Sequence, residues 1–147
     1  MQPAFSFVPL SLLMEPRPLG PAVPVTVGPG TSFLGLSMKL TGLPTGVIDW
    51  PTLAPSSQPG ASGAATIRGQ HVGDLMLRLV SYSAGYAADH WCHKGHIVFV
   101  VAGGATIEHE DGRRYELSAG MAYHVPDNEG APHRVMSRDG ATVFIVD

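Results

Sequence analysis

Frequent turn signals are the feature that most limits what this 147-residue chain can fold into. From residue 64 onward, a glycine, a proline or an Asp-Gly pair interrupts the sequence about every ten residues, a spacing typical of short strands. An α-helix of ordinary length needs a longer uninterrupted window. The spacing therefore predicts an all-β fold, either a barrel or a sandwich.

Several segments have the alternating hydrophobicity or the β-branched content of strands. They are residues 64–69, 74–83, 96–103, 104–110, 113–118, 121–127, 133–137 and 142–147. The run 96–103 is continuously apolar, which predicts a strand buried on both faces. The pair Asp111-Gly112 predicts a tight hairpin between two of the strands.

The two parts of the chain differ in composition. Residues 1–45 are rich in proline and glycine and show no helix or strand period, so we expect a poorly ordered segment. Residues 46–147 are expected to form one domain, and within it residues 51–63 are expected to be a loop.

Charge and cysteine content exclude several classes of function. The net charge is −3 and no lysine–arginine cluster occurs, which argues against a partner made of nucleic acid. No apolar run reaches the ~18–20 residues of a membrane helix. A single cysteine cannot form an internal disulfide, and the N-terminus lacks the basic region of a signal peptide. We therefore expect a cytoplasmic protein.

Potential metal ligands are concentrated in the stretch "GYAADHWCHKGH", residues 85–96. His90 and Cys92 are two residues apart and so project to the same face of an extended chain. His96 shares their parity if the strand resumes in register, whereas His93 has the opposite parity and should point away. Imidazole and thiolate are the usual ligands of zinc and also suit iron.

A further donor is expected from a distant part of the chain. His133 follows Gly130 and Pro132, which permit a turn and then hold the chain in an extended conformation at the start of a strand. The sequence therefore predicts a metal site formed by four residues: His90, Cys92, His96 and His133. The alternative is a polar interior with hydrogen-bonded imidazoles and an inert buried thiol.

The spacing of this stretch resembles the first motif of the cupin superfamily, which is a glycine, five residues, His-x-His, three or four residues, a glutamate, six residues and a glycine. Here His90 and Cys92 stand for the histidine pair, and His96 stands for the glutamate. Gly103 closes the motif at the expected distance, while Gly85 lies one residue closer to the pair than usual.

The second cupin motif is also recognisable. It is a glycine, five residues, Pro-x-Gly, two residues, a histidine, three residues and an asparagine. Here Gly120 and Pro126 have the expected spacing, and Gly130 precedes His133 as it should. Two extra residues separate the halves, and Ser137 replaces the asparagine.

More narrowly, residues 46–147 resemble the small DHCW-motif cupin fold proteins. The match rests on the segments "IDWPTLAP", "YSAGYAADHWCHKGH", "DGRRYELSAGMAYHVPDN", "PHR" and "FIVD". The resemblance implies a single double-stranded β-helix, or jelly-roll, barrel with a divalent transition metal, a small-molecule ligand and a homodimeric state. Replacing the usual carboxylate by the Cys92 thiolate favours zinc or iron over manganese or magnesium.

Two functions follow from a metal in such a barrel. The first is an enzyme that acts on a small organic molecule by Lewis-acid or O2 chemistry, with Tyr123 handling protons. The second is a non-catalytic module that binds or senses a metal or small ligand. A cupin without metal is the third reading. We expect Trp91 to be a packing residue, and His71 and His109 to lie at the surface.

Overall fold

The computed structural model describes residues 42–128 and 130–147. Apart from one short 3-10 turn, the regular secondary structure of the described part is all β, which confirms the predicted fold class. The elements are η3 (Trp50–Thr52), β1 (Ser56–Pro59), β2 (Ala64–Val72), β3 (Leu75–Tyr82), β4 (Tyr86–Ala87), β5 (His96–His109), β6 (Arg114–Ser118), β7 (Ala122–Val125), β8 (His133–Ser137) and β9 (Ala141–Val146). The segment predicted to be poorly ordered, 1–45, lies almost wholly outside the described residues.

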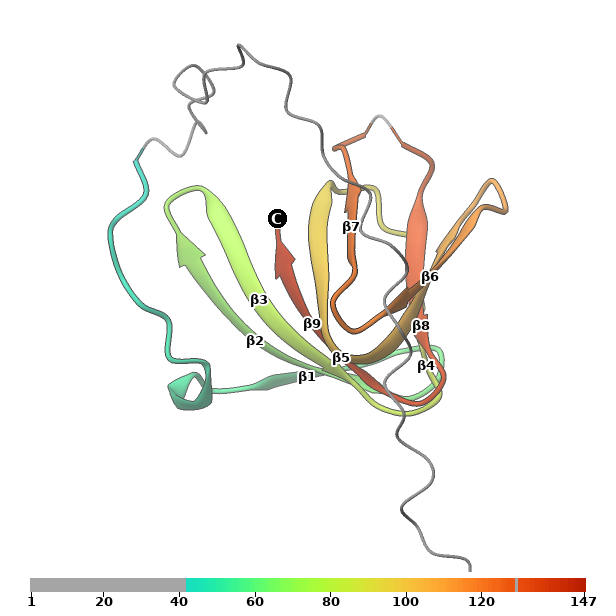
Figure 1. The fold of residues 1–147 in the computed structure, drawn as a ribbon, viewed down its shortest axis with the longest axis horizontal. Coiled ribbons are helices and arrows are strands. Elements are labelled where there is room, and N and C mark those ends of the chain that lie inside the picture. Colours follow the sequence, from blue (N-terminus) through green and yellow to red (C-terminus); the bar gives the residue numbers. More distant parts are fainter. Residues whose placement is uncertain (1–41, 129) are drawn as a thin grey trace, which may run out of the picture. The chain divides into compact units, whose positions relative to one another are not determined.

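All strand pairs are antiparallel, and the strands follow the order β1-β2-β3-β9-β5-β8-β4, with β6 and β7 also paired to β5. Strand β5 joins the two halves of this curled arrangement (Figure 1). Its first part pairs with β7 and β9, and its second part pairs with β6 and β8. The predicted strands 96–103 and 104–110 are therefore one bent strand.

An irregularity in the middle of β5 changes which residues face the interior. The pairing with β9 shifts register between Val100 and Ala102. Val98 and Val100 are buried before the shift, whereas Ala105 and Ile107 are buried after it. A bulge of this kind lets one strand turn the corner between two sheets while both halves keep apolar side chains inside.

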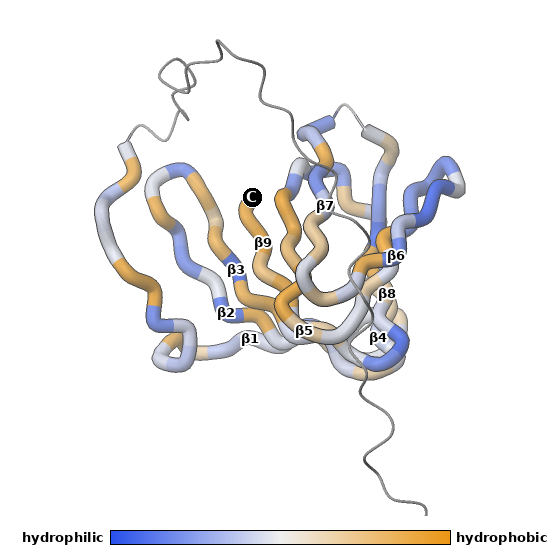
Figure 2. The backbone as a smooth tube through the Cα atoms, viewed as in Figure 1, coloured by the Kyte–Doolittle hydropathy of each residue, from blue (hydrophilic) through white to orange (hydrophobic). Residues whose placement is uncertain are grey.

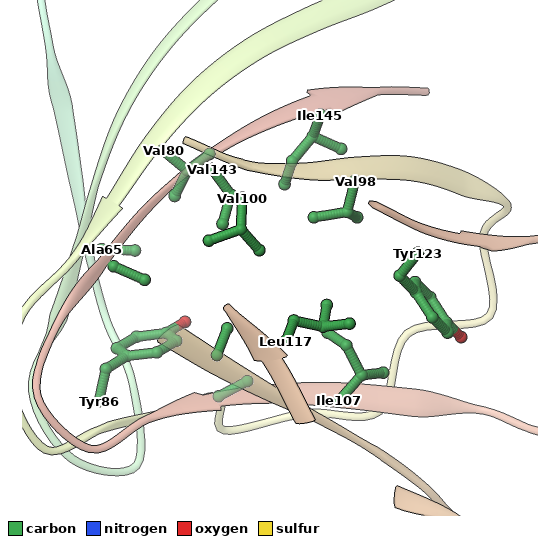
Figure 3. Packing of buried hydrophobic residues seen from close by; sticks show 13 residues of the cluster. Ala65, Val80, Tyr86, Val98, Val100, Ile107, Leu117, Tyr123, Val143 and Ile145 are labelled. Atoms are coloured by element: carbon green, nitrogen blue, oxygen red, sulfur yellow. The ribbon is translucent and has the colours of Figure 1, made fainter. Parts of the chain in front are cut away.

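The core consists mostly of small and medium-sized side chains. Its members are Ala65, Val80, Tyr86, Ala88, Val98, Val100, Ala105, Ile107, Leu117, Tyr123, Ala141, Val143 and Ile145. Figure 3 shows Val80, Val98, Val100 and Val143 of the first sheet packed against Ile107 and Leu117 of the second, with Tyr86 and Tyr123 at opposite ends of the cluster. In Figure 2, β9 and the first part of β5 are largely hydrophobic, while the tip of the β5–β6 hairpin is hydrophilic.

Two sequence-based predictions about faces and loops are wrong. The run 96–103 is not buried on both faces, because Ile97, Phe99 and Val101 are 56, 42 and 49% exposed. The predicted loop 51–63 contains the edge strand β1, which pairs with β2. The predicted hairpin at Asp111-Gly112 is confirmed, since β5 and β6 pair on either side of it.

A charged cluster covers the outside of the second sheet. Glu108 accepts hydrogen bonds from Arg114 of β6, with a 3.0 Å contact to Nε, and from Arg134 of β8, with a 2.7 Å contact to Nε. Both arginines lie directly opposite Glu108 in the strand register. The Arg134 guanidinium also stacks 4.5 Å from the centre of the Trp91 ring, so Trp91 packs as expected. The hydrogen bonds from Arg114 and Arg134 hold the pKa of Glu108 below its usual value.

We expect the Glu108→Gln variant to be less stable than the wild type at pH 7, with a difference that becomes smaller as the pH is lowered into the acid range. A carboxylate with a depressed pKa in the folded state adds stability above its unfolded pKa of about 4.3, and that stability is lost as the pH falls through the folded value. Urea denaturation at pH 7 and at pH 3 measures the difference. Glu116→Gln on β6, which removes a carboxylate without an arginine partner among the described residues, is the control. A difference that does not shrink at all between pH 7 and pH 3 would contradict the electrostatic origin.

Candidate metal and ligand site

A cavity of about 590 Å³ opens into the interior of the barrel. Its inner walls come from both sheets and include Ala65, Val80, Ala105 and Val143. Alanine and valine at these positions leave space that leucine or phenylalanine would fill. Because alternate residues of a strand face inward, apolar side chains form much of the cavity wall. Polar side chains also line the cavity, several of them at strand ends.

Three of the predicted ligands meet at the wall of this cavity: Cys92, His96 and His133. One ligand atom from each lies within 4.8 Å of the other two. The Cys92 Sγ is 3.2 Å from Nε2 of His96, and the rings of His96 and His133 meet edge to face at 5.2 Å between centroids. The arrangement brings together one thiol and two imidazoles.

The backbone itself joins the two distant segments that supply these donors. The Cys92 N–H donates to the His133 carbonyl at 2.7 Å, and the His133 N–H donates to the Cys92 carbonyl at 3.0 Å. This isolated bridge places the loop before β5 beside the start of β8. His96 is the first residue of β5, so all three donors are anchored to the sheet framework.

A carboxylate orients the His96 ring. Asp147 lies 2.5 Å from Nδ1 of His96 and also accepts from Nη2 of Arg78 at 2.7 Å. Burial acts to raise the pKa of Asp147, but the contacts with His96 and Arg78 outweigh it and hold the pKa below its usual value. An ionised Asp147 keeps a proton on Nδ1 of His96, so that Nε2 presents its lone pair toward Cys92.

His133 contributes a neutral imidazole. Its burial, together with the nearby His96, His109 and His93, lowers the pKa to about 4. Its Nδ1 atom is buried and has no hydrogen-bond partner among the described residues. A neutral ring, a second imidazole with an oriented lone pair and a thiol are a donor set that fits a first-row transition metal of the zinc or iron type.

The structure does not bring His90 into this group. Its side chain is 72% exposed, and Nδ1 lies 2.6 Å from the Asp89 carboxylate, although the residue does line the cavity. Its role as a fourth ligand stays a prediction. His93 is exposed, in agreement with its expected parity.

Tyr123 lines the same cavity from β7. Its hydroxyl is 2.7 Å from Nε2 of His109, and its ring centroid lies 6.0 Å from that of His133. Burial, with a contribution from Tyr115, raises the pKa of Tyr123 to about 12, so the phenol is protonated at neutral pH. The expectation that His109 lies at the surface is wrong, because the residue is only 4% exposed.

The residues missed from the sequence are those that support the ligands. Asp147 directly follows β9 and Arg78 lies on β3, and both line the cavity on the same side as buried Val143 and Val80. Alternation with Val143 and Ile145 is the signal for Asp147, whereas the inward direction of Arg78 depends on how β3 pairs in the sheet. The alternation along β5 predicts an inward-facing His109 only when the register shift between Val100 and Ala102 is taken into account.

Comparison with protein families gives a match of residues 79–147 to the family model described as "Cupin domain". Comparison with curated proteins gives no match. Within the described part of the chain, no helix has the length and hydrophobicity needed to cross a bilayer.

Three solved structures illustrate the similarity in fold. The EutQ protein of Clostridium difficile is 18% identical, with a TM-score of 0.56 over 68% of this chain and 83% of its own. The polyketide cyclase RemF of Streptomyces resistomycificus is 15% identical, with a TM-score of 0.56 over 69% and 78%. A structure from Silicibacter pomeroyi, described as a sugar phosphate isomerase from a cupin superfamily, is 16% identical, with a TM-score of 0.55 over 69% and 74%.

Proposed function

Because this chain carries a cupin domain, we propose that it is a metal-dependent enzyme that acts on a small organic molecule inside the barrel. The metal would be zinc or iron, held by Cys92, His96 and His133. The observation that supports this proposal best is the group of three converging donors on the wall of a cavity of about 590 Å³.

The number of donors favours catalysis over a purely structural role. Structural zinc sites usually have four protein ligands, whereas catalytic sites have three and keep a position for water or substrate. With three donors in the group and His90 turned toward Asp89, one position would remain exchangeable. The two enzymes among the compared structures share the fold alone with this chain at 15–16% identity, so they do not identify a reaction.

A metal in this position would supply Lewis-acid activation, or O2 binding if it is iron. The remaining tasks fall to the residues of the chain. Asp147 holds the His96 ring in place, and the apolar walls keep bulk water away from a bound molecule. Tyr123, protonated and directed at His109, would donate a hydrogen bond or a proton to a substrate oxygen.

Elemental analysis of protein purified without oxygen tests this function. We expect about one zinc or iron per chain, with one coordination position that exchanges water or small anions in the absorption spectrum of a cobalt-substituted sample. A closed site with four protein ligands would instead support the alternative of a binding or sensing module. Protein that stays empty after reconstitution would contradict both metal-based functions.

We further propose that the chain forms a homodimer through the outer face of β5. Ile97, Phe99 and Val101 alternate along this face, and Met121 beside it is 45% exposed. Phe99 lies opposite Phe144 in the register, and the Trp50 ring packs against Phe144 with 6.0 Å between centroids. A row of large apolar side chains on a sheet is typical of a surface that meets another protein, and a second copy supplies a matching apolar row by symmetry.

Replacing Phe99 by glutamate is expected to convert the dimer to a monomer, because a charge would be buried at the centre of the apolar row. Light scattering coupled to size-exclusion chromatography should give about twice the chain mass of 15.5 kDa for the wild type and the chain mass for the variant. Val47→Glu is the control, since Val47 is 95% exposed and lies outside β5. A monomeric wild type at tens of micromolar would contradict the proposal.

A further inference from the structure

We propose that the ligand of the cavity is a small organic carboxylate whose charged end is held by Arg78. This inference rests on the proposed function, because it identifies the class of molecule that would bind beside the metal. It is carried by the position of an arginine among the apolar side chains of the cavity wall and by the hydrogen-bond donors that this arginine leaves unused.

Arg78 points inward because of its place in β3. Val80 and Tyr82 share its face, and both line the cavity. In the register, Arg78 lies opposite Ile145 of β9, another cavity residue. An arginine in a layer of apolar side chains is costly unless its charge and its donors find partners.

The partner present in the structure uses only part of the guanidinium. Both contacts with Asp147 come from Nη2, at 2.7 Å to Oδ1 and 2.6 Å to Oδ2. The Nε atom of Arg78 is buried without a hydrogen-bond partner among the described residues. A guanidinium has five N–H donors in a fixed fork that matches a carboxylate, so the contacts with Asp147 leave capacity for a second acceptor.

The charges around the cavity favour an anion. Arg78, Lys94 and Arg134 line it on three different segments, against the single carboxylate of Asp147. Arg134 is neutralised by Glu108 on the outer side of the sheet, whereas Lys94 has no carboxylate partner among the described residues. One negative charge on a ligand would therefore balance the cationic excess.

The rest of the ligand would be apolar. Much of the remaining lining consists of valine, alanine and isoleucine side chains and of the stacked rings of Tyr82 and Tyr86, 4.6 Å apart between centroids. Such walls offer neither a second charge nor a row of hydrogen-bond partners, so they suit an aliphatic or aromatic body better than a sugar or a nucleotide. Phenylacetate and hexanoate represent this class.

Isothermal titration with these two acids and with phenylacetamide, the neutral counterpart of phenylacetate, tests the inference. The titrations are made with chelator-treated protein and with zinc-loaded protein, so that binding to Arg78 is measured with and without the metal. We expect phenylacetate to bind the wild type at least tenfold more tightly than the amide. The Arg78→Gln variant should lose at least tenfold in affinity for the acid, and Arg78→Lys should lose less because it retains the charge.

Arg68→Gln is the matched control, because Arg68 lies on the adjacent strand β2, opposite Leu79, and does not line the cavity. It should bind both acids as the wild type does. Equal affinity of the wild type for acid and amide, no binding of either acid at millimolar concentration, or unchanged binding by Arg78→Gln would each overturn the inference. A protein that binds the acids through Arg78 but takes up no zinc or iron would refute the proposed metal function and leave this inference standing.

Discussion

Replacing Cys92 by serine is expected to lower the affinity for zinc or iron by more than about a hundredfold, since changes to residues that only support metal ligands already cost about 10–100-fold. The variant removes the sulfur that lies 3.2 Å from Nε2 of His96, and a serine hydroxyl is a much poorer donor for these metals. Competition with a chromophoric chelator measures the affinity, and elemental analysis gives the occupancy.

Variants of the neighbouring histidines make this result specific. His93→Ala, in the same loop but exposed, should leave the metal content unchanged. His133→Ala should behave like Cys92→Ser, because its ring belongs to the same group of donors. The metal affinity of His90→Ala shows whether the exposed imidazole of His90 acts as a fourth ligand. A wild type and a Cys92→Ser variant that stay equally empty after reconstitution would rule out the metal site.

A second large effect is expected on stability from Gly103→Ala, with a loss of about 3 kcal/mol or more. Gly103 closes the first sequence motif and lies where β5 turns between the sheets, with φ at +75°. A Cβ atom there would lie 2.2 Å from the Gly140 carbonyl oxygen, which is backbone and cannot rotate away. Strain in the left-handed region and a direct clash would thus act together, and urea denaturation measures their sum.

Gly120→Ala separates the two contributions. Gly120 also has a positive φ, +88°, but no atom lies within 4 Å of a Cβ built on it. Its loss should be limited to the backbone strain, about 1–2 kcal/mol. Equal losses in the two variants would show that the corner of β5 adjusts to accept a side chain.

The strands and the hairpin could be predicted from the sequence because their signals are local. Asp111-Gly112 specifies a tight turn whatever surrounds it. The alternating hydrophobicity of residues 74–83 also predicted that β3 exists, but it did not predict which face of β3 points into the barrel. Leu77 and Leu79 form the more apolar row, yet the interior row contains Arg78 and Val80. Which row faces inward is decided by the pairing with β9 and by contacts such as that of Arg78 with Asp147, and neither is a local property.

The site was predictable to the extent that its residues are close in sequence or stand beside a rigid turn. Cys92, His96 and His133 meet as expected. His109 was missed because the register shift in β5 reverses the alternation before it, and no local pattern reports that shift. Asp147 was missed because its partner His96 lies 51 residues away, and only the folded sheet brings the carboxylate to the ring.

In many metalloproteins, folding and metal binding depend on each other. The paired main-chain hydrogen bonds between Cys92 and His133 bear on this dependence. Where folding waits for an ion to gather scattered ligands, removing the ion unfolds the chain. Here the peptide groups hold two donor segments together independently of what the side chains bind. We therefore expect the proposed site to be preformed: removing or exchanging a bound ion, or changing the side chains at positions 92 and 133, should leave the surrounding strands in place.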